Sequence, residues 1–141
     1  MSTITFDVDA GAVTQALRTL PAELERRVQA ASEITARRIA AEAQRRLRAQ
    51  LGPDATGTTV AGIEARPSKS GRGWVVLADH PDTPSLPLWL EKGTRAGKRR
   101  NGATIPPRPF FYAAALLETE AHARRVRDAM AEAATAVGLG E

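Results

Sequence analysis

The feature that most constrains this chain is a stretch of thirty residues, 21–50, in which no glycine and no further proline follow Pro21. Proline suits the first turn of a helix, and Gly52-Pro53 ends one. At 1.5 Å per residue such a helix would be about 45 Å long. Its apolar positions recur at close to helical spacing: Leu24, Val28, Ala31, Ile34, Ile39 and Leu47, with thin contacts from Ala36, Ala40 and Ala43.

The apolar residues of the chain are mostly small. Alanine supplies 27 of the 60 hydrophobic residues, whereas Leu, Ile, Val and Phe together number 28 of 141. This share of large apolar residues is near the level below which a chain rarely buries enough apolar surface to fold on its own. We therefore expect a thin fold that completes its burial against other copies of itself.

Length and residue types exclude several classes of protein. A chain of 141 residues fits a single domain over residues 1–141. The absence of cysteine excludes disulfides, thiolate metal sites and cysteine nucleophiles. No apolar run approaches the roughly 18 residues that span a bilayer, and the first residues lack the regions of a signal peptide. We expect no membrane partner and a protein that stays in a cytoplasm.

The remaining pattern predicts an α+β fold, in which two long antiparallel helices pack against a small, mostly antiparallel sheet. Strands are expected near residues 3–8, where Ile4, Phe6 and Val8 share one face, and near 58–67 and 73–79, joined by a turn over 68–73. A short helix is expected over 12–20, before the long one, and a helical turn over 86–92, ended by Gly93.

A closing helix is expected from Phe110 to about Val137. Its apolar stripe is predicted to pack on the long first helix and comprises Phe110, Ala113, Leu117, Ala123, Val126, Met130, Ala133 and Val137. Between Gly93 and this helix lies a basic segment, about 94–108, which we expect to be a flexible loop. Its cations are Arg95, Lys98, Arg99, Arg100 and Arg108, and it contains no acidic residue.

No motif in the chain favours an enzyme. Residues 93–99 have one residue too few between the glycines for a phosphate-binding loop, and Arg99 replaces the Ser/Thr that would bind Mg²⁺. Asp79-His80-Pro81-Asp82 is better explained as a proline turn than as a metal or acid/base site. Pro106 to Pro109 is best interpreted as an extended lead-in to the last helix. We predict no catalytic residue, no metal and no cofactor.

Arginine pairs recur along the long helix at positions 26–27, 37–38 and 45–46. Residues 18–50 hold eight Arg and four Glu, so this face could follow a phosphate backbone. Interleaved Arg and Glu are also typical of an ordinary solvated or subunit-facing helix. A small basic DNA-binding protein therefore stays open as an alternative of another class.

Three landmarks follow one another along the chain. The long helix ends at Pro53-Asp54-Ala55-Thr56-Gly57, Trp89 precedes a Glu-x-Gly-Thr sequence at 91–94, and Pro109-Phe110 precedes the closing helix. In this order they resemble a tail-component family of long-tailed bacteriophages, typified by the tenth gene product of phage Hong Kong 97. The resemblance covers about residues 10–137.

The resemblance implies a structural virion protein of the neck, where the head connector meets the tail, with tail terminator as the main alternative within that class. It implies a homo-oligomer, expected to be a hexameric ring, whose partners are the head-completion (stopper) protein, the tail terminator and the tail tube protein. DNA is then only passing cargo in the channel. The expected location is the virion and, during assembly, the host cytoplasm.

The candidate interaction site is the basic loop with its two hinges. The Glu91 carboxylate is expected to accept backbone N–H groups of the turn that it enters, and Gly93 to supply a positive φ. Trp89 with Phe110 and Phe111 is expected to anchor the loop to the body of the protein. The predicted interaction residues are Trp89, Glu91, Gly93, Thr94, Arg95, Lys98, Arg99, Arg100, Pro109, Phe110 and Phe111.

Overall fold

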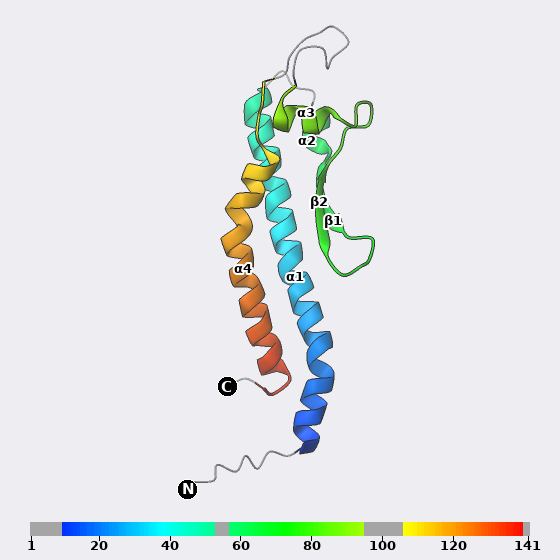
Figure 1. The fold of residues 1–141 in the computed structure, drawn as a ribbon, viewed down its shortest axis with the longest axis vertical. Helices are drawn as coiled ribbons and strands as arrows, with labels where there is room; N and C mark the ends of the chain where they lie inside the picture. The colour runs from blue at the N-terminus through cyan, green and yellow to red at the C-terminus, as the bar shows by residue number, and fades with distance from the viewer. Residues whose placement is uncertain (1–9, 53–56, 95–105, 140–141) are drawn as a thin grey trace.

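A computed structural model describes residues 10–52, 57–94 and 106–139 (Figure 1). Its elements are α1 (Ala10–Leu51), α2 (Thr58–Ala61), β1 (Ile63–Pro67), β2 (Trp74–Ala78), α3 (Leu86–Lys92) and α4 (Phe111–Ala136). The predicted α+β fold, with two long antiparallel helices and a small antiparallel sheet, is confirmed. The expected strand near residues 3–8 lies outside the described residues.

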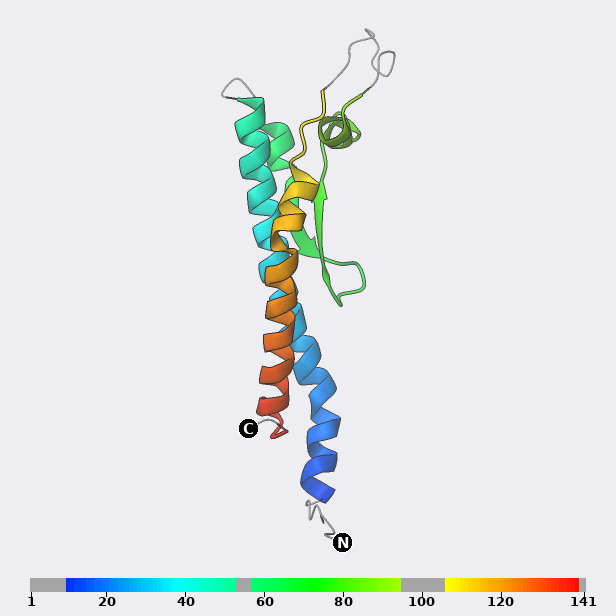
Figure 2. The same cartoon turned by 60° about the vertical axis from the view of Figure 1, so that its left-hand side comes forward.

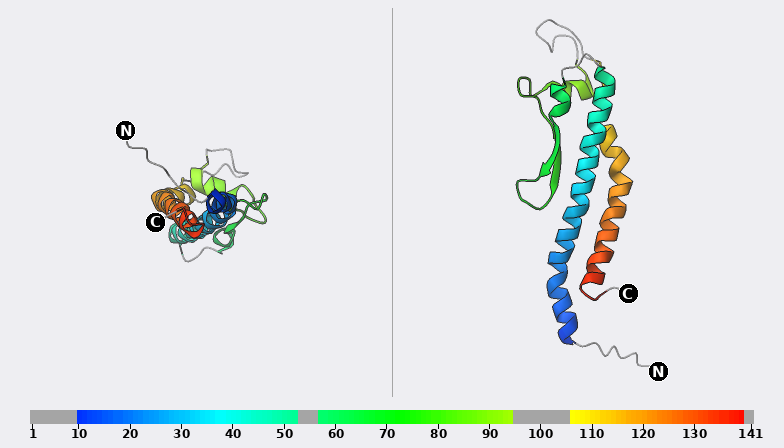
Figure 3. Two further views of the ribbon diagram at one scale, coloured as in Figure 1. Left: turned by 90° about the horizontal axis from the view of Figure 1, so that it is seen from below. Right: turned by 180° about the vertical axis from the view of Figure 1, so that it is seen from behind.

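Helix α1 is the central element of the molecule. The β-hairpin lies along one side of its upper half and α4 along the other, and this order is the same from the front and from behind (Figures 1 and 3). The lower end of α1 extends beyond the C-terminal end of α4 (Figure 2). The first turns of α1 therefore lie beyond the end of α4.

The predicted break at Pro21 is wrong, because residues 10–51 form one continuous helix with Pro21 inside it. A proline removes one backbone donor, which leaves the carbonyl of Leu17 without its helical partner. Leu17 and Pro21 are both exposed, so water can take the place of the missing donor. The flanking residues are mostly good helix formers, and they keep the axis intact across the gap.

The hairpin is shorter than predicted at its first strand. β1 pairs with β2 in antiparallel register from Ile63 opposite Ala78 to Pro67 opposite Trp74. Residues 58–61, expected to be strand, form the helical turn α2 instead, because the Ala61 N–H bonds to the Gly57 carbonyl at 2.8 Å. Gly62 then joins α2 to β1, and a Cβ at this position would collide with the Asp79 carbonyl oxygen.

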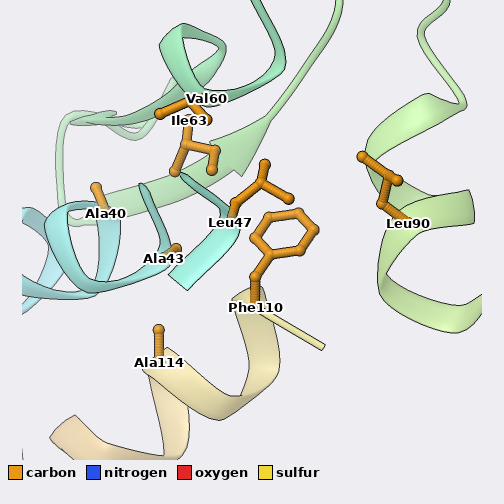
Figure 4. Close-up of a cluster of buried hydrophobic side chains, with 8 residues drawn as sticks. All are labelled: Ala40, Ala43, Leu47, Val60, Ile63, Leu90, Phe110 and Ala114. Carbon is orange, nitrogen blue, oxygen red and sulfur yellow. The ribbon is translucent and has the colours of Figure 1, made fainter. Parts of the chain in front are cut away.

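The core lies where the upper half of α1 meets the hairpin, α3 and the start of α4 (Figure 4). Its largest fully buried side chains are Phe110, Leu47 and Ile63. The other buried members are smaller or peripheral: Ala40, Ala43, Val60, Leu90 and Ala114. Few large side chains therefore hold all the elements together.

The predicted apolar stripe of α4 is confirmed in part, since Phe110 and Ala133 are buried and Ala113, Val126 and Val137 are half-buried. Ala114, Ala129 and Ala133 are the buried residues of α4, whereas Leu117 and Met130 are 60% and 52% exposed. Ala123 is exposed as well. The alanines allow close approach of the two helices, and the larger side chains of α4 are left on the surface.

Candidate functional site

The predicted hinge is built around the carboxylate of Glu91, near the end of α3. Its Oε2 atom accepts the backbone N–H groups of Phe110 at 2.8 Å and Phe111 at 2.9 Å, and its Oε1 atom accepts that of Tyr112 at 3.1 Å. Glu91 is only 8% exposed. The carboxylate therefore caps the N-terminus of α4 from a position 19 residues earlier in the chain.

This geometry corrects one expectation. Glu91 was predicted to accept N–H groups of the turn that directly follows it, at Gly93 and Thr94, but it accepts those of the first residues of α4. The physical reason is that the first N–H groups of a helix have no partner within the helix, and the helix dipole favours a negative charge there. Glu91 nevertheless links the residues before the basic segment to those after it.

Two further hydrogen bonds hold the base of the basic segment, which is formed by the end of α3 and the residues that lead into α4. The Arg108 N–H donates to the Leu90 carbonyl at 2.7 Å, and the Gln50 side-chain amide donates to the Pro109 carbonyl at 3.0 Å. At the other end, Gly93 has the predicted positive φ, of 74°. The residue Arg108 is therefore held beside the end of α3, close to Gly93 in space although it follows Gly93 by 15 residues in the chain.

Aromatic side chains surround this base. The ring of Phe110 is 1% exposed and lies in the core, in edge-to-face contact with Phe111 at 6.3 Å between ring centroids. Trp89 is half-buried and packs against the same core. Trp89, Phe110 and Phe111 therefore all lie in or against the core, on the two described sides of the basic segment.

Of the predicted interaction residues, the structure brings together those of the base: Trp89, Glu91, Gly93, Pro109, Phe110 and Phe111. Thr94 follows them and is half-buried. The cations Arg95, Lys98, Arg99 and Arg100 lie outside the described residues. Gln50 and the Arg108 backbone were missed by sequence reasoning, because neither carries a local signal for a partner so far along the chain.

A groove of about 250 Å³ lies next to the hinge. It runs between β2, α3 and the start of α4, and its walls are mostly apolar. The side chains that line it include Val76 and Ala78 of β2, Pro87 and Leu88 of α3, and Phe111 and Tyr112 of α4.

A polar layer crosses the α1–α4 interface below the core. Buried Thr35 donates from Oγ1 to the Ala31 carbonyl at 3.1 Å and accepts from Arg125 at 2.9 Å. A hydroxyl has one proton, so the 2.8 Å contact between this oxygen and His122 Nδ1 needs the ring nitrogen as donor. Arg125 also pairs with Glu118 at 2.9 Å. His122 therefore belongs to the polar contacts that join α1 and α4.

The arginines of α1 are largely paired within the helix. Arg26 and Arg27 bond to Glu23, Arg37 to Glu33, and Arg45 and Arg46 to Glu42. The hydrogen bond from Arg45, together with that from Arg46, lowers the pKa of Glu42 to about 2. This pairing is typical of a solvated helix surface.

The described residues contain no group of three or more His, Cys, Asp or Glu side chains arranged to hold a metal ion. Asp79 and His80 form a turn, as predicted: Asp79 Oδ1 accepts the His80 N–H at 2.8 Å, and His80 Nδ1 accepts the Thr83 N–H at 3.0 Å. None of the described helices is both long and apolar enough to span a membrane.

No protein-family model matches this chain, and no curated protein or solved structure is significantly similar to it.

Proposed function

We propose that this chain is a structural virion protein of a long-tailed phage or prophage, and that a ring of its copies in the neck joins the head connector to the tail. The observation that carries the proposal is the Glu91 clamp. A buried carboxylate with three backbone hydrogen bonds fixes the base of an eleven-residue segment, 95–105, that holds four cations and no acid. Such a base is suited to presenting a charged segment to an acidic surface of a neighbour.

Two further features support assembly rather than chemistry. The core holds few large side chains, and several large apolar side chains of the helices lie on the surface, among them Leu17, Ile34, Leu116, Leu117 and Met130. Other subunits that pack on these side chains would remove their apolar surface from water. In the ring we propose, these residues face neighbouring copies, the stopper protein or the tail tube.

Two rival functions make different predictions. A tail terminator would cap the tail tube, so its loss would leave tails of irregular length. A DNA-binding protein would bind duplex DNA with an affinity that falls steeply as salt rises from about 50 to 200 mM. The internal pairing of the α1 arginines with Glu23, Glu33 and Glu42 argues against the second rival.

The test replaces Lys98, Arg99 and Arg100 together by glutamine in the phage genome. We expect micrographs of the lysate to show separate heads and tails, because the segment has lost the charge that reaches the acidic partner. The melting temperature of the purified variant should stay almost unchanged, since exposed charges contribute little to folding.

The matched control replaces Arg38, Arg124 and Arg127 by glutamine. These three cations are exposed, lie on α1 and α4, and form no ion pair with any residue in the described ranges. The control removes the same charge and should leave particle yield normal. Normal yield from the 98–100 variant would refute the proposal, as would a melting temperature that collapses with it.

A further inference from the structure

Among the described residues, strand β2 is paired with β1 on one edge and with no strand on the other. The hydrogen bonds from Asp79 N–H to the Gly62 carbonyl and from Ser68 N–H to the Gly73 carbonyl fix which residues of the hairpin bond to each other. By the alternation of an antiparallel pair, the backbone groups of Val75 and Leu77 point to β1, and those of Trp74, Val76 and Ala78 point away from it. Nothing within the described ranges is hydrogen-bonded to these outward groups.

The apolar groove beside the hinge lies along this edge. Val76 and Ala78 form one wall of it, and Leu88 and Tyr112, opposite, are 52% and 56% exposed. An unpaired edge next to apolar side chains is a template for another strand. A strand added here would satisfy the free backbone groups and place every second side chain in the groove.

Residues 3–8 have the pattern that such a position requires. In Thr3-Ile4-Thr5-Phe6-Asp7-Val8 the apolar residues alternate with polar ones. One face of this segment would enter the groove and the other would face solvent. With six residues against the five of β2, its length also matches.

The same chain cannot supply this strand to its own sheet. Trp74 of β2 lies beside Arg37, whose guanidinium is 5.3 Å from the indole ring centre. Arg37 follows Ala10 by 27 residues of continuous helix, and at 1.5 Å per residue the rise is about 40 Å. Fully extended, residues 3–10 span at most about 25 Å. The continuity of α1 through Pro21 therefore separates the segment from the edge that it matches.

We propose that residues 3–8 of a second copy add to the free edge of β2 and cover the groove. The donor segment and the acceptor edge lie at different places on one chain, so each copy can give a strand to one neighbour and receive one from another. A contact of this kind closes into a ring when the rotation between copies allows it. The inference rests on the proposed function in one respect, since it names the contact by which the subunits of that ring join.

The natural lack of cysteine makes this contact testable by cross-linking. One chain carries Val75→Cys, on the solvent-facing side of β2, and the other carries Thr3→Cys, Thr5→Cys or Asp7→Cys. Residues opposite each other in neighbouring strands have Cα atoms about 4.5–5.5 Å apart, within the range of a disulfide. After mixing and mild oxidation, at least one of the three pairs should give a disulfide-linked dimer.

The matched control pairs Val75→Cys with Ala131→Cys, which is exposed near the end of α4. It should give no more dimer than random collision. Dimer at the control level for all three N-terminal positions would overturn the proposal. So would a bridge within one chain as the main product when Val75→Cys and Thr5→Cys are combined in diluted protein.

A second measurement needs no cysteine. Phe6→Asp should weaken self-association in sedimentation velocity by at least about tenfold, as the loss of a buried interface aromatic does. Thr5→Asp, which puts the same charge on the opposite face, should change it less than about threefold, because rim charges contribute little. Equal effects, or a wild-type chain that stays monomeric, would contradict the proposal.

These outcomes are separable from the function proposed above. The cross-link is measured on purified protein without heads or tails, so a negative result leaves the loop experiment and its interpretation intact. Normal particles from the loop variant would leave a positive cross-link standing as a contact between copies.

Discussion

Glu91 shows how much a single side chain can decide in a protein with a thin core. Its position after Leu90 and before Gly93 suggests a residue that bonds to backbone, and this much was predictable. The identity of the partners was not, because Phe110, Phe111 and Tyr112 become neighbours of α3 only when the rest of the chain has folded.

Replacing Glu91 by alanine should lower the free energy of unfolding by about 2–3 kcal/mol, because it leaves three N–H groups at the start of α4 without their charged acceptor. Glu91→Gln, which keeps one acceptor oxygen, should lose less. Urea denaturation followed by circular dichroism measures both. Glu120→Ala, an exposed glutamate on the same helix α4, is the control and should change stability by less than about 0.5 kcal/mol.

The two tryptophans should differ in their contribution to stability. Trp89 packs against the core, whereas Trp74, the first residue of β2, lies under the guanidinium of Arg37. Both are half-buried, so each truncation should cost less than the roughly 3–5 kcal/mol of a fully buried aromatic. We expect Trp89→Ala to lower the melting temperature more than Trp74→Ala, and equal losses would contradict this ranking.

At the scale of elements, the sequence predicted which helices and strands exist better than where they begin and which face they bury. The helical period of residues 21–50 and the turn at 68–73 were sufficient for α1 and the hairpin. The break at Pro21 was predicted wrongly because the good helix formers on both sides outweigh the effect of one proline. Residues 58–61 were predicted as strand because of their composition, but the turn between Gly57 and Gly62 makes them helical. The buried face of α4 was predicted only in part, because alanines, which carry almost no hydrophobic signal, make much of the contact with α1.

The ion pairs of α1 should give this helix a pH dependence in acid. The pKa of Glu42 is lowered to about 2 by Arg45 and Arg46, and that of Glu23 is lowered by Arg26 and Arg27. A lowered pKa in the folded state means that the stabilisation is present above about pH 4.5 and is lost as the pH falls towards 2. Thermal unfolding between pH 5 and 2 should therefore show decreasing stability, with a flatter profile in Glu42→Gln.

High salt provides the control for that profile. Arg45 is exposed and Glu42 only half-buried, so added salt should screen their interaction and reduce the difference between the variant and the wild type. A Glu42→Gln profile that runs parallel to the wild-type profile at every pH would show that this carboxylate does not contribute to the acid sensitivity.

At the scale of the whole molecule, stability is concentrated at the upper end, where α1, the hairpin, α3 and the start of α4 meet (Figure 4). Below the core, α1 and α4 are held together by alanines and by the polar layer of Thr35, His122 and Arg125. The molecule should therefore lose its structure from the lower end first when stability is reduced.

Within the upper end, side chains should differ sharply in their contribution: Phe110 and Leu116 both belong to the first turns of α4 or its cap, but one is 1% exposed and the other 74%. Phe110→Ala should cost about 3–5 kcal/mol, because it removes the largest side chain shared by four elements. Leu116→Ala should cost less than about 0.5 kcal/mol in the free chain. If Phe110→Ala does not fold, Phe110→Leu should still show a loss of about 1–2 kcal/mol by urea denaturation.

The clamp at Glu91 has a consequence for how a lineage of such chains can change. Because the two ends of the segment after Gly93 are bonded at Leu90 and Arg108, the folded body does not depend on the number of residues between them. Doubling the length of a closed loop costs only about 0.6 kcal/mol of chain entropy. Insertions, deletions and changes of charge in this segment can therefore accumulate during evolution while the helices and the core stay the same. The same fold can in this way adapt to a partner whose surface changes.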